Sequence, residues 1–217
     1  MYVEWMDVSD AKDFLRLVSA ECERRAALLP EGDDGYHQWM FTDLPFLHDL
    51  CILYLIAVRH HVERQLLFFA SQATEHGNRI THEEFIAVRD SIATKRAGSW
   101  KEIVTRLKPE TCARYETMET LRLLANSYKH DPHMKPMKEL LERLRLDTTR
   151  NYMPLPESFA LKEGLARFVG LPDDADFWTI THRYVEHAEE FLNAVKTQNR
   201  LSPIKPRRFD FRTDIGH

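Results

Sequence analysis

The stretch LPFLHDLCILYLIAVRHHVERQLLFFASQA, residues 44–73, predicts a long helix at the centre of an all-α fold. Its first half is apolar on nearly every side, which is typical of a helix that is packed on all its faces. Pro45 falls in the first turn, a position that tolerates proline. The most apolar run, Cys51 to Val58, is far shorter than the roughly 20 residues that a membrane helix needs, so we expect no membrane association.

Helical patterns also surround this central stretch. Residues 9–29 open on Ser9, a good N-cap, and carry apolar residues at helical spacing. Capping boxes at residues 81–84 and 99–102 mark two further helix starts. Helical patterns follow in residues 111–130, 137–146, 157–170 and a last helix capped by Asp174 or Asp176. Because short turns join these segments and no hairpin signal occurs, they predict an up-and-down helical bundle.

The bundle is expected to form a single domain over residues 1–217. Within it, residues 1–42 are predicted to form an N-terminal helical extension and residues 43–197 the bundle core. Residues 198–217 are predicted to form an irregular, basic and flexible C-terminal tail. Arginines and phenylalanines alternate in this tail and could contact a nucleic acid, although solvated charges at a flexible end are the simpler interpretation.

Charge and cysteine content narrow the function classes. The net charge of -4 gives no protein-wide attraction for nucleic acid, so RNA binding would need a local basic surface. Cys22, Cys51 and Cys112 are far apart and form no C-x-x-C pair, which favours a reducing, cytoplasmic location. Glu-x-x-His pairs, H-E-x-x-H, P-loop and G-x-G-x-x-G motifs are all missing from the sequence. We therefore expect neither a metal nor a cofactor.

The helix predicted over residues 111–130 carries the best candidate site. Arg122, Asn126 and His130 follow one another at i+4 spacing, and Lys129 lies beside them. An arginine can bind a phosphate with two hydrogen bonds, a lysine adds a point charge, and a histidine can transfer a proton near neutral pH. A metal-independent ribonuclease needs these groups. Cations near a helix C-terminus also simply complement the helix dipole, so a solvated helix end stays open as an alternative.

The segment VRHHVER, residues 58–64, is the second candidate. His60 and Arg64 share one helix face, as do Arg59 and Glu63, which can form an ion pair. Arg59, His60 and Arg64 are therefore candidate substrate-binding residues if this helix packs beside the one that carries His130. An ordinary polar surface between helices is the alternative.

Three segments together resemble the HEPN superfamily of small helical bundles. They read RHHVERQLLFFA (residues 59–70), LRLLANSYKH (residues 121–130) and RYVEHAEEFLNAV (residues 183–195). The resemblance spans residues 43–197. Many members of this superfamily are RNases of toxin and phage-defence systems, and their motif helices often face each other across a dimer. The resemblance therefore implies an RNA-directed homodimer.

The match to the HEPN motif is partial. Active members carry an arginine, often followed by a polar residue, shortly before a histidine. Asn126 and His130 match the polar residue and the histidine, whereas Ala125 stands where the arginine is expected. Arg122 lies one turn earlier on the same face, with seven residues between it and His130. The departure leaves open whether the chain catalyses a reaction.

Two main functional interpretations follow, and the first is an RNA-directed protein that acts as a metal-independent endoribonuclease. In it, His130 transfers the proton, Arg122 and Lys129 stabilise the phosphate, and Asn126 orients the reacting groups. The second is a non-catalytic helical interaction module that binds a cognate protein partner or a nucleotide. A purely structural dimer, whose polar face is only a solvated helix end, is a third alternative.

Overall fold

The computed structural model describes residues 8–38, 44–72, 105–129, 135–149 and 158–201, together with Glu83 and Ala87. The fold is all-α, as predicted. Its helices include α1 (Val8–Ala26), α2 (Asp33–Gln38), α3 (Leu44–Gln72), the 3-10 helix η2 (Pro109–Thr111), α6 (Tyr115–Lys129), α7 (Lys135–Leu144), α8 (Ser158–Phe168) and α9 (Phe177–Gln198). Apart from Glu83, the capping boxes predicted at residues 81–84 and 99–102 lie outside the described residues, as does the tail beyond residue 201.

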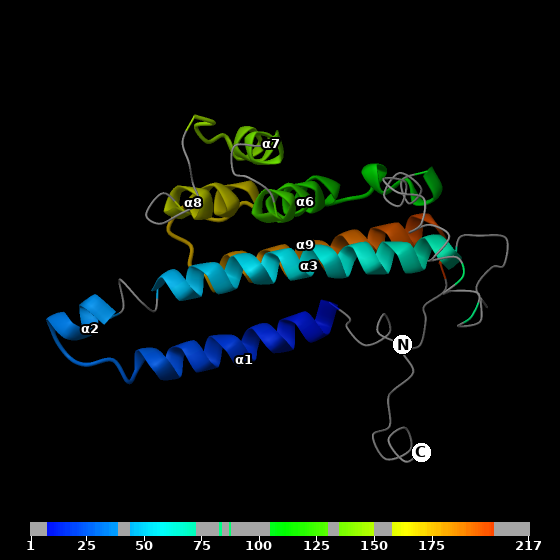
Figure 1. The fold of residues 1–217 in the computed structure, drawn as a ribbon. Helices are drawn as coiled ribbons and strands as arrows, with labels where there is room; N and C mark the ends of the chain where they lie inside the picture. The colour runs from blue at the N-terminus through cyan, green and yellow to red at the C-terminus, as the bar shows by residue number, and fades with distance from the viewer. Residues whose placement is uncertain are drawn as a thin grey trace, which may run out of the picture.

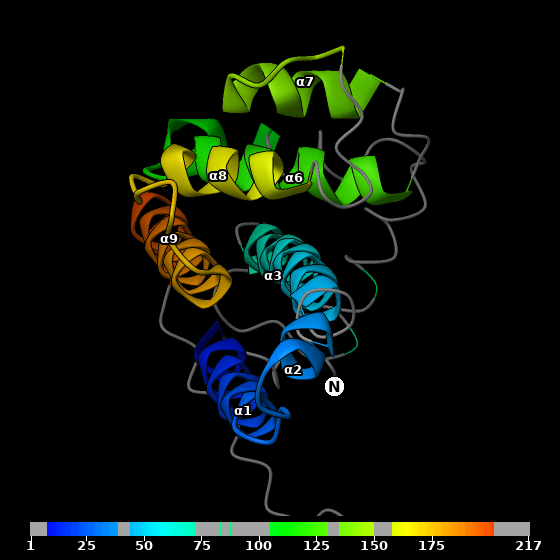
Figure 2. The ribbon, with the colours of Figure 1, turned by 90° about the vertical axis from the view of Figure 1, so that its left-hand side faces the viewer.

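The helices are stacked in layers around α3 and α9, which lie side by side (Figure 1). α1 packs on one side of this pair, and α6 packs on the other side (Figure 2). α8 lies in the same layer as α6, beyond its end (Figure 1), and α7 packs on both of them from outside (Figure 2). α6 runs antiparallel to α3 and α9, so the start of α6 lies near the ends of both long helices (Figure 1). This arrangement is the bundle that the helical periodicity predicted.

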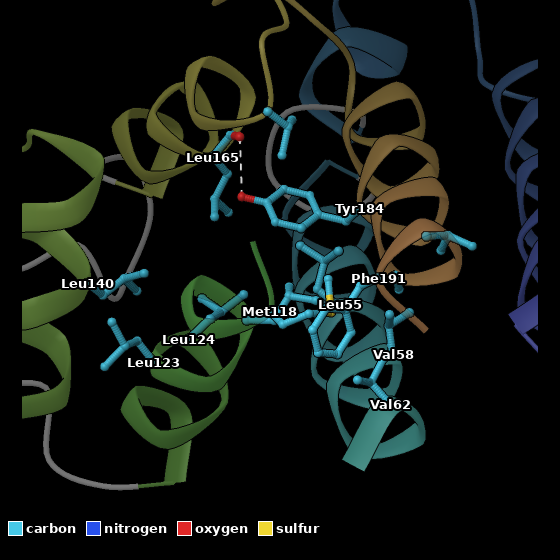
Figure 3. Packing of buried hydrophobic residues seen from close by; sticks show 14 of the residues in the cluster. Leu55, Val58, Val62, Met118, Leu123, Leu124, Leu140, Leu165, Tyr184 and Phe191 are labelled. Carbon is cyan, nitrogen blue, oxygen red and sulfur yellow. Dashed lines mark hydrogen bonds between the residues drawn. The ribbon is translucent and has the colours of Figure 1, made fainter. Parts of the chain in front are cut away.

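The core lies where α3, α6 and α9 meet (Figure 3). Leu55, Val58 and Val62 of α3 face Met118 of α6 and its neighbours, and all of these side chains are buried. Tyr184 of α9 is fully buried among them. Its hydroxyl donates a hydrogen bond to the Leu165 carbonyl oxygen at 3.3 Å, which satisfies the polar atom in an apolar environment (Figure 3). Each helix therefore contributes an apolar stripe to one shared core.

Helix α3 matches the predicted residues 44–73 to within one residue. Among the described helices, none combines the length and the apolar character that crossing a membrane would need. The predicted cap of the last helix is also confirmed, because Asp176 accepts a hydrogen bond from the Thr179 amide at 2.7 Å. Trp178, in the first turn of this helix, is half-buried.

The largest error in the predicted boundaries concerns the helix expected to begin at Thr111. A 3-10 turn occupies Pro109–Thr111, and α6 begins at Tyr115 because Arg114 adopts a left-handed conformation with φ 65°. The Asn199 side chain donates a hydrogen bond to the Leu107 carbonyl oxygen at 3.1 Å, and Gln198 donates to the carbonyl oxygens of Leu107 and Lys108. The end of α9 therefore holds the chain in place just before α6 begins.

The N-terminal segment differs in two details. Ser9 lies inside the first turn of α1, which begins at Val8, rather than before the helix. The short helix α2 follows α1 in a segment where the sequence patterns indicated no separate helix. A Cβ atom on Gly35 of α2 would collide with the Pro30 carbonyl oxygen. Glycine thus permits a turn tighter than the sequence pattern indicated.

Two leucines of α3 test the assignment of its buried face. Leu55 is 2% exposed and Leu53 is 57% exposed. We expect Leu55→Ala to lower the free energy of unfolding by about 2–5 kcal/mol, because it leaves a cavity in the core. Leu53→Ala should change it by less than about 0.5 kcal/mol. Urea unfolding of both variants measures the difference, and equal losses would contradict the orientation of α3.

Candidate functional site

Arg59 and Arg122, which are distant in sequence, lie within electrostatic range of each other where α3 packs on α6. The charge of Arg122 and that of Glu119, both on α6, act on the Arg59 guanidinium of α3. Arg122 Nε donates a hydrogen bond to Glu119 Oε2 at 2.8 Å. Arg59 Nη1 lies 3.7 Å from Glu63 Oε2, as the i+4 spacing predicted. We call Arg59, Glu63, Glu119 and Arg122 the ion cluster.

Arg59 is the most deeply buried member of this cluster. It is 4% exposed, and burial lowers its pKa while the carboxylates of Glu63 and Glu119 raise it. An arginine stays charged in proteins, so its positive charge has to be compensated inside the helix contact. The two carboxylates provide that compensation. The prediction that Arg59 contacts a substrate stays a prediction, and its burial means that a ligand would reach Arg122 more easily.

His60 and Arg64 lie beside the cluster on α3. His60 is half-buried, and its Nδ1 is 3.7 Å from Glu63 Oε2. Arg64 is exposed one turn further along the helix. The two residues therefore share a face that continues from the cluster towards solvent, and their predicted role in substrate binding stays a prediction.

Arg122 is the open guanidinium of the cluster, with its side chain 33% exposed. Its Nε is committed to Glu119, and neither of its Nη groups makes a hydrogen bond to another described residue. Asn126, one turn later and half-buried, likewise makes no hydrogen bond within the described part of the chain. Lys129 is the last residue of α6. Its side chain and the whole of His130 lie outside the described residues.

A polar contact between α6 and α9 was not predicted from the sequence. The buried His187 places its Nδ1 3.1 Å from Thr117 Oγ1. Burial lowers the His187 pKa, and the nearby Arg114 lowers it further. Arg114 is itself paired with Glu190, with 2.6 Å between Nε and Oε2. In the sequence, His187 lies between Tyr184 and later apolar residues on the buried face of α9. This position indicates a buried histidine.

No group of three or more His, Cys, Asp or Glu side chains that could hold a metal ion occurs among the described residues. The ion cluster and the His187–Thr117 pair thus offer hydrogen-bond and charge chemistry. No family model, no curated protein and no solved structure matches the chain.

Substitution of Glu119 tests whether the ion cluster stabilises the fold. We expect Glu119→Gln to lower the free energy of unfolding by about 1–3 kcal/mol, because the buried Arg59 loses part of its compensation. Glu116→Gln is the matched control on the same helix. Its side chain is exposed and pairs with Arg143, so the change should stay within about 0.5 kcal/mol.

A second substitution tests whether the charge of Arg59 causes the loss of stability in Glu119→Gln. If the loss in Glu119→Gln arises from the uncompensated charge of Arg59, adding Arg59→Met should recover part of it, because an apolar side chain needs no compensation. Chemical unfolding of the single and double variants measures this recovery. An additive further loss in the double variant would contradict the proposed coupling.

His187 predicts a pH dependence of stability. Its folded-state pKa is lowered from 6.5, so the unfolded chain takes up a proton first as the pH falls through that value. The free energy of unfolding therefore decreases towards acidic pH, and the full contribution is present above the pKa of the unfolded state. Between pH 7.5 and about 5.5 we expect a smaller decrease for His187→Gln than for the unmodified chain. The control His182→Gln, on the same helix, should keep the larger decrease in the same urea titrations.

Proposed function

We propose that the chain is an RNA-directed protein whose α6 face binds the phosphate backbone through Arg122 and Asn126. The observation that carries this proposal is the geometry of Arg122. Glu119 holds its Nε at 2.8 Å, which leaves both Nη groups for a ligand. A guanidinium fixed in this way can bind two phosphate oxygens at once, and the ordering of its side chain has already been achieved.

The same face has the groups of a metal-independent endoribonuclease. In that role His130 would take the proton from the attacking ribose 2'-hydroxyl, and Arg122 with Lys129 would offset the charge that develops on phosphorus. Asn126 would orient the phosphate by a hydrogen bond. In the sequence, His130 directly follows Lys129, the last described residue of α6. No step of this chemistry requires a metal.

The burial of Ala125 explains how this site would depart from the HEPN pattern that the sequence resembles. Ala125 is a core position of α6, so an arginine there would push its charge into the apolar interior. Arg122 is one turn earlier and partly open to solvent. The resemblance supports the RNA proposal, with Arg122 as the guanidinium of this face.

A second candidate function is a non-catalytic helical module that binds a protein partner or a nucleotide. The charge balance of the ion cluster favours it, because Arg59 and Arg122 are offset by Glu63 and Glu119. A neutral cluster attracts phosphate less strongly than a basic patch does. For either function we propose a homodimer in which the α6 faces of two copies contribute to one site.

RNA binding is tested with a matched pair of arginines. Arg167 of α8 is also paired through its Nε, which lies 2.9 Å from Asp173 Oδ1, but it is not part of the ion cluster. We expect Arg122→Gln to weaken binding of mixed-sequence single-stranded RNA about tenfold, since a charged hydrogen bond is lost. Arg167→Gln should leave the affinity unchanged. Fluorescence anisotropy at fixed salt measures both, and equal affinities would contradict the proposal.

Catalysis is tested in the same samples with chelator present. Cleavage by the unmodified chain that His130→Ala abolishes, with RNA binding retained, would support the ribonuclease assignment. Binding that depends on Arg122 without any cleavage would instead support the non-catalytic module. Light scattering of these samples should give the mass of a dimer, and a strict monomer at micromolar concentration would contradict a site shared between two copies.

A further inference from the structure

A pocket of about 370 Å³ opens between α1 and α9. α1 contributes Ser19 and Glu23 to its wall, and α9 contributes Trp178, His182, Arg183 and Glu186. Its volume is at the small end of ligand pockets, which typically measure about 300–1,000 Å³. Residues of α1 and α9 line the pocket, whereas the ion cluster belongs to α3 and α6. Helices α1 and α6 lie on opposite sides of the α3–α9 pair (Figure 2). The pocket is therefore separate from the surface proposed for RNA.

Three charged side chains around the pocket, those of Asp176, Arg183 and Glu186, already have partners within the wall. Asp176 caps α9 and accepts hydrogen bonds from the Thr179 amide at 2.7 Å and the Thr179 hydroxyl at 3.0 Å. Arg183 Nη1 lies 3.2 Å from Glu186 Oε2. These groups form the frame of the pocket, and Arg183 offsets one of the two carboxylates, so the frame keeps a negative charge.

Among the described residues, Glu23 and His182 are the ionisable groups of the wall that have no ion-pair partner. Within the described residues, neither side chain takes part in a hydrogen bond or an ion pair. Trp178 adds a half-buried aromatic surface to the same wall. The pocket thus combines an uncompensated carboxylate with an indole. A carboxylate attracts a cation, and an indole face favours a flat cation that can stack on it.

We propose that this pocket binds a small organic cation, namely a guanidinium group on a short apolar stem. The guanidinium would pair with Glu23 and stack on Trp178, while the His182 ring supplies a hydrogen-bond acceptor. The apolar stem would contact the rest of the indole. This binding does not depend on the proposed RNA function.

The probe for this site is butylguanidinium, with butylurea as a control of almost the same shape but without charge. The chain contains 4 Trp, so protein labelled with fluorotryptophan gives separate fluorine NMR signals, and Trp178→Phe identifies the signal of Trp178. We expect butylguanidinium to shift this signal saturably at millimolar concentration, and butylurea to leave it in place. Equal shifts with both probes, or no shift with either, would overturn the proposal.

A matched pair of glutamates on α1 tests the contact. Glu23→Gln should weaken butylguanidinium binding about tenfold, because it removes the paired charge. Glu21→Gln is the control, since Glu21 is paired with Arg24 and does not line the pocket. Both residues are exposed, and circular dichroism confirms that the variants stay folded. Equal affinities of the two variants would show that Glu23 does not hold the cation.

Discussion

The burial of α3 against two partners is the constraint on which the rest of the structure depends. One helix of 29 residues cannot cover its own apolar surface, so α6 and α9 have to lie along it on different sides. The buried stripe that contains Val58 and Val62 does not stay apolar, because Arg59 is buried within it. This single charge requires carboxylates in the same helix contact, and Glu63 and Glu119 supply them. The packing of α3 and the ionic chemistry of α6 are thus two aspects of one contact.

The parts of the fold that depend on local patterns were accessible from the sequence. The length of α3, the cap at Asp176 and the presence of α7 and α8 follow from helical periodicity and capping chemistry, which act over a few residues. The start of α6 was not accessible. It depends on Arg114 in a left-handed conformation and on hydrogen bonds from the far end of α9.

The candidate sites show the same division between local and tertiary information. The spacing of Arg122 and Asn126 indicated a shared polar face. The meeting of Arg59 with Arg122, and of His187 with Thr117, depends on how whole helices pack, and no pattern within one helix shows it. The pocket beside Trp178 is a further example, because its wall needs α1 as well as α9. Sequence spacing can thus indicate candidate site residues, but tertiary packing determines which of them lie close together.

The amide side chains at the end of α9 hold the segment that leads into α6 by hydrogen bonds. Gln198 and Asn199 donate hydrogen bonds to the carbonyl oxygens of Leu107 and Lys108. In the sequence, the basic C-terminal residues follow directly. Loss of these hydrogen bonds would therefore free the segment that leads into α6, the helix that carries Arg122.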